Sequence, residues 1–171
     1  MKSSDARIFV LMGVSGSGKT MIGTLLATKT CVVFADADDY HSQSNKQKMA
    51  VGVPLNDEDR KPWLEALNVV LVGWWKAGSG GVLACSALKA SYRATLAAGM
   101  PEGTIHFVLL EGSHELIAAR LAARTHAYMN PKLLDSQFAT LEIPEDAYAI
   151  VNDRAPEVIA AEILKHFEGQ S

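Results

Sequence analysis

The residues with the clearest chemistry lie near the start of the chain, in the segment 13–20. This segment reads GVSGSGKT and fits the pattern G-x-x-x-x-G-K-[ST], the loop that wraps nucleotide phosphates. Glycine adopts backbone conformations closed to other residues, so successive N–H groups can point at phosphate oxygens. We expect Lys19 to reach the β- and γ-phosphates of ATP and Thr20 to hold Mg²⁺. The nucleotide-binding residues predicted in this loop are Gly13, Val14, Ser15, Gly16, Ser17, Gly18, Lys19 and Thr20.

Two carboxylates, Asp36 and Asp38, follow an apolar run. Two residues apart in an extended chain, they can project to the same side of the backbone. Phosphoryl transfer to an alcohol needs an acceptor for the hydroxyl proton and ligands for hydrated Mg²⁺. We assign Asp38 as the base or substrate-orienting group and Asp36 to the Mg²⁺ water shell. Exchanged roles, and a merely solvated acidic turn, stay open as alternatives.

The third apolar run of the chain ends without an acid. It closes on Cys85 and Ser86, where many P-loop proteins have an Asp or Glu. GTPases and motor ATPases use that acid to hold Mg²⁺. Its absence here separates the chain from those classes. The acidic pair Asp36 and Asp38, which follows the second apolar run, instead favours a kinase that acts on a small metabolite.

Several cations lie near predicted ligand-facing ends of helices. Arg120 and Arg124 are four residues apart and would share a helical face just before a predicted mobile lid at about 124–132. They suit clamping of the phosphates or of the adenine ring, and a solvent-facing helix is the alternative. An anionic acceptor would need a further cation, because arginine binds a carboxylate through two parallel hydrogen bonds. The candidates are Arg60, Lys89 and Arg93.

Strand-like and helix-like segments alternate along the chain and would position these residues. Apolar runs predict strands at 7–12, 31–35, 81–85, 104–110 and 147–151. Helical patterns predict helices at about 19–29, 43–50, 59–76, 87–98, 113–124, 131–141 and 155–167. Asp59 is the expected cap of the third helix, with Pro62 in its first turn. The alternation predicts an α/β fold with a doubly wound, five-stranded parallel sheet covered on both faces.

Length and composition indicate a single domain spanning 1–171. Its 171 residues are 49% hydrophobic and 20% charged, which is ordinary for a soluble protein. A net charge of -3 gives no support for a nucleic-acid or membrane partner. The polar first residues are no signal peptide and no apolar run is long enough to span a membrane, so we expect a cytoplasmic protein. The two cysteines, Cys31 and Cys85, are expected to be buried free thiols. More than forty residues separate the second and third strands, and they predict a substrate-binding insertion at about 37–80.

Longer segments of the chain resemble the P-loop gluconate kinases. They are DADDYH at 36–41, NKQKM at 45–49, GVPLNDEDRKPWL at 52–64, CSALK at 85–89 with Tyr92-Arg93, and LLDSQFATLE at 133–142. The resemblance covers nearly the whole chain. It implies the fold shared with shikimate and nucleoside monophosphate kinases, and transfer of the ATP γ-phosphate to the 6-hydroxyl of D-gluconate. Many members are dimers, so a homodimer is expected.

The resemblance also implies roles for individual residues. Asp38 would face the acceptor hydroxyl, Arg124 would act on the phosphates from the lid, and the loop 152–156 is similar to the adenine-side loop of these kinases. Arg60, Lys89 and Arg93 would surround the sugar acid. The predicted sets are Lys19, Asp38 and Arg124 for catalysis, Arg120, Arg154 and Pro156 as further nucleotide contacts, Thr20 and Asp36 for the metal, and Asp38, His41, Arg60, Ser86, Lys89 and Arg93 for the acceptor. His41 is the weakest of these, because lone histidines in polar loops are usually only solvated.

The chain departs from the family pattern at a few positions. Ala37 stands where the family usually has Gly, and Ser42 where it usually has Pro. The lid pattern Arg-x-Gly-His-Phe is RTHAY here, so His126 and Ala127 occupy the glycine and histidine positions. Whether His126 replaces the missing histidine stays open.

Two rival functions follow from the same residues. A kinase of another acceptor, such as shikimate or a nucleotide, would share the fold and the P-loop, but the segment 52–64 argues against it. A non-catalytic ATP-sensing module would bind the nucleotide alone. The paired acids and the lid arginines argue against that second rival.

Overall fold

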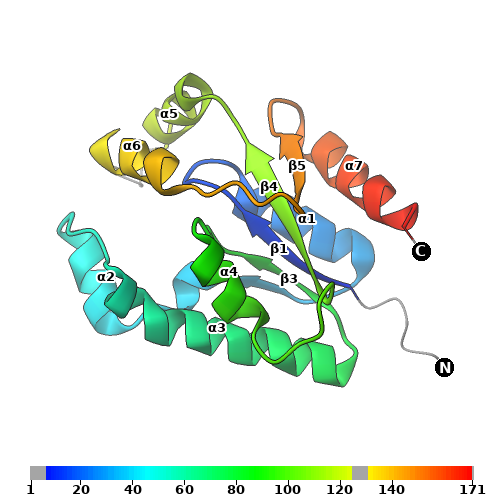
Figure 1. Cartoon of the computed structure of the whole chain (residues 1–171). Helices are drawn as coiled ribbons and strands as arrows, with labels where there is room; N and C mark the ends of the chain where they lie inside the picture. Colours follow the sequence, from blue (N-terminus) through cyan, green and yellow to red (C-terminus); the bar gives the residue numbers. More distant parts are fainter. Residues whose placement is uncertain (1–6, 125–130, 171) are drawn as a thin grey trace.

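The computed structural model describes residues 7–124 and 131–170, and residues 1–6, 125–130 and 171 lie outside the description. The described chain forms one five-stranded sheet in the order β2-β3-β1-β4-β5, and every neighbouring pair of strands is parallel. Its strands are β1 (Ile8–Met12), β2 (Phe34–Asp36), β3 (Gly81–Ala84), β4 (Ile105–Glu111) and β5 (Tyr148–Val151). The predicted α/β parallel fold is confirmed (Figure 1).

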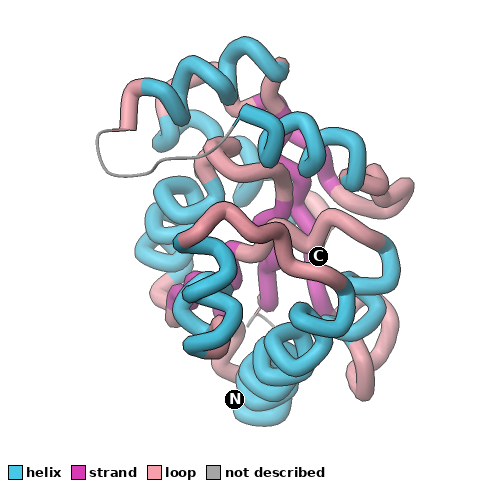
Figure 2. Tube along the Cα trace, turned by 90° about the vertical axis from the view of Figure 1, so that its left-hand side faces the viewer, coloured by secondary structure: helices cyan, strands magenta, loops and turns pink. Residues whose placement is uncertain are grey.

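Helices cover both faces of this sheet, as Figures 1 and 2 show. They are α1 (Lys19–Thr30), α2 (Gln43–Ala50), α3 (Asp57–Ala77), α4 (Ala90–Ala97), α5 (His114–Ala122), α6 (Pro131–Thr140) and α7 (Pro156–Glu168), with a short 3₁₀ helix η1 (Ala37–Tyr40) after β2. None of the helices in the described part of the chain is long and apolar enough to cross a membrane.

Alternating side chains of β1 supply two hydrophobic cores on opposite faces of the sheet. Ile8, Val10 and Met12 pack with buried residues of α3 and α4. Phe9 and Leu11 pack with buried residues of α1 and α7. Successive side chains of a strand point to opposite faces, so a strand covered on both sides needs an uninterrupted apolar run. The sequence of β1 supplies that run, and all five of its residues are buried.

The connections that follow the strands meet at one edge of the sheet, because all the strands are parallel. β1 leads into the P-loop, β2 into η1, and β3 into the turn 85–89 before α4. A third apolar cluster joins α5 and α6 to this edge through Val14 of the P-loop and Leu88 of the turn, which pack with Ile117 and Leu134. Ligands of open α/β sheets bind at this carboxyl edge.

The predicted elements are all present, with ends shifted by at most three residues. β2 begins at Phe34 instead of 31, because Cys31 ends α1 in a left-handed conformation with φ of 56°. That residue is exposed, so the expectation of two buried thiols is wrong for Cys31 and confirmed for Cys85. α4 begins at Ala90 instead of 87, since Ala87 also has a positive φ of 47° and cannot continue a helix.

The start of α3 corrects the predicted cap. Asn56 accepts a hydrogen bond from the Asp59 N–H at 2.7 Å, and the Asp59 carboxylate accepts one from the Asn56 N–H at 3.1 Å. This reciprocal pair is a capping box, so Asp59 is its third helical residue and not the cap. Pro62 consequently lies in the second turn of α3 and not in the first.

Two helical glycines predict opposite effects of adding one methyl group. A Cβ at Gly23 of α1 would lie 2.7 Å from the ring of Phe34, whereas a Cβ at Gly73 of α3 would meet nothing within 4 Å. We expect Gly23→Ala to lower the free energy of unfolding by about 1–3 kcal/mol through overpacking. Gly73→Ala should raise it by about 0.5–1 kcal/mol, because alanine favours the helix. Urea unfolding followed by circular dichroism measures both, and shifts of the same sign would contradict the packing described.

Candidate active site

A cavity of about 870 Å³ opens at the carboxyl edge of the sheet. The P-loop, the end of β2, the end of β3, α5 and the loop after β5 all contribute to its wall. Of the predicted site residues, the following line it: Ser15, Gly16, Gly18, Lys19, Thr20, Asp36, Asp38, Ser86, Arg120, Arg124, Arg154 and Pro156. The structure thus brings the predicted nucleotide, metal and catalytic residues to one place.

The remaining predicted residues do not line this cavity. Gly13, Val14 and Ser17 are buried within the P-loop itself. His41, Arg60, Lys89 and Arg93 lie elsewhere. Of the predicted lid, Arg124 lines the cavity, whereas residues 125–130, which include His126 and Ala127, lie outside the described residues.

The P-loop is shaped by positive φ angles and by one close contact. Gly18 has a φ of 96°, and a Cβ there would lie 2.3 Å from Nδ2 of Asn152. That amide donates to the main-chain oxygen of Ser17 at 2.7 Å. The loop conformation therefore requires glycine at position 18 for both its backbone angle and its space.

Asn152 connects the loop to the rest of the site, although the sequence had suggested no role for this residue by itself. Its N–H donates to the Glu111 oxygen at 2.8 Å, which extends the pairing of β4 with β5. The main-chain oxygen of Asn152 accepts a hydrogen bond from Nη2 of Arg120 at 2.5 Å. The other terminal nitrogen of Arg120, Nη1, is buried and has no partner among the described residues. Since Arg120 lines the cavity, this nitrogen can serve an anionic ligand there.

Lys19 is folded back onto its own loop. Its Nζ donates to the main-chain oxygens of Gly13 at 3.0 Å and of Val14 at 2.9 Å. Desolvation within the loop lowers the pKa of Lys19 to about 8, against an opposing effect of Asp38. A bound phosphate would give this ammonium group an anionic partner in place of the two neutral carbonyl oxygens.

The acidic pair is arranged differently from the extended chain predicted for 36–38. Asp36 caps the 3₁₀ helix η1, and its Oδ1 accepts the Asp38 N–H at 3.0 Å. Its Oδ2 accepts the hydroxyl of Thr20 at 2.8 Å. The extended prediction is wrong because an aspartate side chain readily bonds the N–H two residues on and so initiates a turn. Both carboxylates still line the same cavity.

Asp38 differs from Asp36 in its surroundings. Its side chain reaches solvent through the cavity, and within the described residues its carboxylate accepts no hydrogen bond. The neighbouring protein nevertheless desolvates it and, with the negative charge of Asp36, raises the pKa of Asp38 above its usual value. A carboxylate that is free of partners and has a raised pKa is suited to accept a proton.

Arg154 and Cys85 also line the cavity. The charge of Arg154 is paired, and Cys85 is uncharged. Arg154 forms a two-pronged ion pair with Glu162 of α7, at 2.5 and 2.9 Å. Burial raises the pKa of the Cys85 thiol to about 12, so it is uncharged at neutral pH. Neither group is therefore a free charge in the cavity.

His41 is packed instead of solvated, which corrects the expectation for this residue. Its ring stacks on Trp63 with the centroids 4.2 Å apart, and Trp63 donates from Nε1 to the Ala37 oxygen at 2.7 Å. Burial, followed by the charges of Arg60 and Lys46, lowers the pKa of His41. Its Nδ1 is buried and has no partner within 7–124 and 131–170.

Arg93 is buried at the base of the turn before α4. Its Nη1 donates to the main-chain oxygens of Ala87 at 2.7 Å and Leu88 at 3.2 Å, and Nη2 donates to that of Glu142 at 2.9 Å. These bonds shape the turn that carries Lys89. A direct contact of Arg93 with the acceptor stays a prediction.

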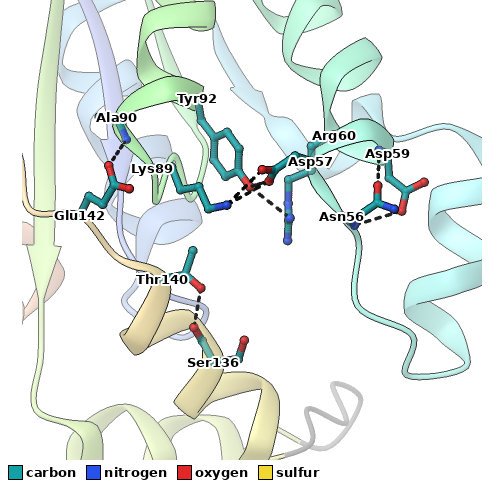
Figure 3. Close-up of polar contacts among 10 residues, drawn as sticks. All are labelled: Asn56, Asp57, Asp59, Arg60, Lys89, Ala90, Tyr92, Ser136, Thr140 and Glu142. Atoms are coloured by element: carbon teal, nitrogen blue, oxygen red, sulfur yellow. Dashed lines mark hydrogen bonds and ion pairs between the residues drawn. The ribbon is translucent and has the colours of Figure 1, made fainter.

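Arg60 and Lys89 lie together in a second group of polar side chains, shown in Figure 3. Arg60 donates from Nη1 to the Tyr92 hydroxyl at 3.2 Å. Lys89 and Tyr92 both donate to the carboxylate of Asp57. We call Asp57, Arg60, Lys89 and Tyr92 the acceptor-side cluster. The sequence had assigned roles to its two cations, whereas Asp57 and Tyr92 had appeared only within the segments of the family resemblance.

Gln137 of α6 is a further residue with a contact that no sequence argument had anticipated. Its Oε1 accepts the Ser15 N–H at 2.7 Å, and its Nε2 donates to the Ser15 hydroxyl at 3.3 Å. The segment 133–142 was part of the family resemblance, which was the available signal. The Ser15 N–H, a main-chain donor of the P-loop, is therefore occupied by Gln137.

The lowered pKa of Lys19 predicts how stability changes with pH. Between about pH 8 and the usual lysine value of 10.5, the unfolded chain binds the proton that the folded chain has lost. Through Lys19, the free energy of unfolding therefore rises as the pH rises through that window. Lys19→Met should remove this rise and stabilise the ligand-free protein at pH 7, as measured by urea midpoints from pH 7 to 10. Lys29→Met, an exposed change on the same helix, is the control, and an identical pH slope in wild type and Lys19→Met would contradict the burial described.

Comparison with known proteins agrees with this geometry. The family model for shikimate kinase matches residues 15–168. The thermosensitive gluconokinase of Escherichia coli K12 is 47% identical over 137 residues, which cover 80% of this chain and 72% of that protein. The gluconokinase of Gluconobacter oxydans 621H is 41% identical over 167 residues, covering 96% and 93%. A solved gluconokinase structure from Sinorhizobium meliloti 1021 is similar with a TM-score of 0.83 and 35% identity, covering 97% and 98%. The chain therefore belongs to the gluconokinase family, within the shikimate kinase group of P-loop kinases.

Proposed function

We propose that this protein transfers the γ-phosphate of ATP to the 6-hydroxyl of D-gluconate, giving 6-phospho-D-gluconate and ADP. The observation that carries the proposal is the shared cavity of Lys19 and Thr20 with Asp36 and Asp38. It combines a phosphate loop with a free carboxylate, which is what transfer to an alcohol requires. The identity to proteins named gluconokinases supports the choice of acceptor.

The described residues fit ATP and Mg²⁺. The P-loop offers the phosphates a glycine-shaped cradle at the start of α1, and Arg120 offers a buried nitrogen that has no partner in the described part of the chain. Thr20 would hold Mg²⁺ directly and Asp36 through its water shell, since Mg²⁺ takes few protein oxygens and keeps several waters. The metal ion supplies charge stabilisation for the transferring phosphoryl group.

In the proposed reaction Asp38 orients the 6-hydroxyl and takes its proton. The hydroxyl oxygen forms a bond to the γ-phosphorus as the bond from that phosphorus to the bridging oxygen of ADP breaks. Lys19, Arg120 and Arg124 stabilise the negative charge on the phosphate oxygens. The protein thus contributes mostly position and charge, as is general for phosphoryl transfer.

The proposal extends to the domain organisation, the assembly and the location of the enzyme. The span 37–80, which holds η1, α2 and α3, would form the acceptor-binding insertion, and the segment at about 124–132 would close as a lid. The whole chain 1–171 would act as one domain, in a cytoplasmic homodimer without a nucleic-acid or membrane partner. Besides Asp38, the acceptor would contact His41, Arg60, Ser86, Lys89 and Arg93.

An acceptor screen tests the proposed function. Release of ADP is measured by a coupled assay with D-gluconate, shikimate and nucleoside monophosphates, each with ATP and Mg²⁺. We expect D-gluconate to stimulate ADP release far more than the others. Strong stimulation by another acceptor would identify a different kinase, and ATP binding with no stimulation by any acceptor would indicate a sensing module.

Substitution of Asp38 tests its role as the base. We expect Asp38→Asn to lower kcat by about 10²–10⁴-fold with little change in the KM for ATP, because only proton transfer and orientation are lost. Since the pKa of Asp38 is raised, wild-type kcat/KM should fall on the acid side at a pH above the usual aspartate value of 3.8. Asp39→Asn, the exposed neighbour, is the control. Near-normal turnover of Asp38→Asn would exclude Asp38 as the base.

A further inference from the structure

The acceptor-side cluster already contains a carboxylate, and it belongs to the protein. Nζ of Lys89 lies 3.1 Å from Oδ1 and 3.2 Å from Oδ2 of Asp57. The Tyr92 hydroxyl donates to Oδ1 of Asp57 and accepts from Nη1 of Arg60. Figure 3 shows these side chains pointing toward one another between the starts of α3 and α4. The Asp57 carboxylate thus accepts hydrogen bonds from an ammonium group and a phenol, and a guanidinium group donates to the same phenol oxygen.

The cluster is built to hold an anion. Arg60 and Lys89 lie 5.6 and 5.4 Å from the ring centroid of Tyr92, close enough for cation–π contacts that keep both cations in place. Arg60 makes no ion pair with a carboxylate within the described chain, so two cations share the single negative charge of Asp57. The hydrogen bond from Tyr92, followed by that from Lys89, holds the pKa of Asp57 below its usual value. The position therefore carries a negative charge at neutral pH.

The side chain of Asp57 takes no part in capping α3. The capping box consists of two reciprocal bonds between Asn56 and Asp59. The side chain of Asp57 is 64% exposed and that of Lys89 is 32% exposed. Exposed ion pairs add little to stability. The carboxylate of Asp57 can therefore leave Lys89 and enter water at small cost.

The cluster also lies on the correct side of the molecule for a substrate. Lys89 caps α4, which begins after the carboxyl end of β3, and Ser86 of the same turn lines the cavity. Asp57 begins α3 in the span that follows η1, the 3₁₀ helix of Asp38. Figure 3 shows α6, with Ser136 and Thr140, on the facing side. A substrate at the cluster would thus share the sheet edge that carries the phosphate loop.

We propose that Asp57 is a built-in occupant of the acceptor's carboxylate site, which it fills in the free enzyme and leaves when the acid group of the acceptor binds to Lys89, Tyr92 and Arg60. The inference rests on the proposed function, because it needs an acidic acceptor. It makes Asp57 a specificity-determining residue. A neutral polyol brings no charge to replace that of Asp57, whereas a sugar acid replaces it with a carboxylate.

Substitution of Asp57 by its neutral isostere tests the proposal. Asp57→Asn keeps the shape and weakens the hold on Lys89, so the KM for D-gluconate should fall by about threefold to tenfold, with kcat changed by less than about twofold. Glu58→Gln removes the same charge from the same exposed helical turn without touching Lys89, and it should leave the KM unchanged. A rise in the KM of Asp57→Asn would show that Asp57 itself holds the acceptor, and an unchanged KM would show that it does not compete. Either result overturns the proposal.

A double-mutant cycle with Lys89 separates competition from a structural effect. Lys89→Met removes the cation for which the two carboxylates compete. The gain from Asp57→Asn should therefore disappear when it is made in Lys89→Met, with the acceptor KM of the double variant equal to that of Lys89→Met. An equal gain in both backgrounds would contradict competition at Lys89. Thermal unfolding of each variant verifies that it is folded.

Formate, the smallest carboxylate, tests the site without any catalysis. Amide shifts of Ala90 and Tyr92 report its binding to wild type, Asp57→Asn and Glu58→Gln in nuclear magnetic resonance titrations. Asp57→Asn should bind formate at least about threefold more tightly than the other two. Equal affinities would overturn the proposal.

These measurements keep the two proposals apart. If the acceptor screen finds another carboxylic acid, the proposed function fails, and a lower KM of Asp57→Asn for that acid with tighter formate binding upholds the role of Asp57. If D-gluconate is the acceptor and formate binds equally to all three proteins, the proposed function stands and the role of Asp57 fails.

Discussion

The parallel pairing of β1 with both β3 and β4 is the constraint on which the rest of the structure depends. It places the carboxyl ends of the strands at one edge, so that the P-loop, η1 and the turn before α4 leave the sheet side by side. The two hydrophobic cores on either face of β1 make this arrangement costly to disturb, because a shift of one residue would exchange the side chains between the cores. Asn152 then fastens the last strand to the loop through Ser17.

Several ligand-binding groups of the free protein have partners within the described chain. Lys19 bonds main-chain oxygens of its own loop, Gln137 accepts the Ser15 N–H, and Lys89 holds Asp57. A buried or half-buried donor without a partner is costly, so such internal contacts stabilise the site before the ligands arrive. Ligands must then replace contacts and not merely add them. At Lys19 and Ser15 charge favours the replacement, since phosphate oxygens carry more negative charge than a carbonyl or an amide oxygen.

The strands, the helices and the P-loop could be predicted because their signals are local. Five apolar runs alternating with helical patterns are sufficient for a parallel α/β sheet, and GVSGSGKT is sufficient for the loop. Two of the errors arose where a side chain has two competing local partners. Asp36 accepts the Asp38 N–H and so begins a 3₁₀ turn. Asn56 is the N-cap of α3, where Asp59 had been predicted. Such choices differ by little free energy, and packing decides them.

The sequence by itself determined the phosphate loop, the order of the elements, and the kinds of residues that face the nucleotide. These follow from residue types and spacing that only one local conformation satisfies. Only the tertiary structure decided which cations are free to bind an anion. Arg93 donates to main-chain oxygens from two segments, Arg154 pairs with Glu162 and Lys89 pairs with the exposed Asp57, whereas Nη1 of Arg120 has no partner among the described residues. Lys89 and Asp57 are 32 residues apart and Arg93 and Glu142 are 49 apart, and sequence spacing at such separations carries no record of the contact.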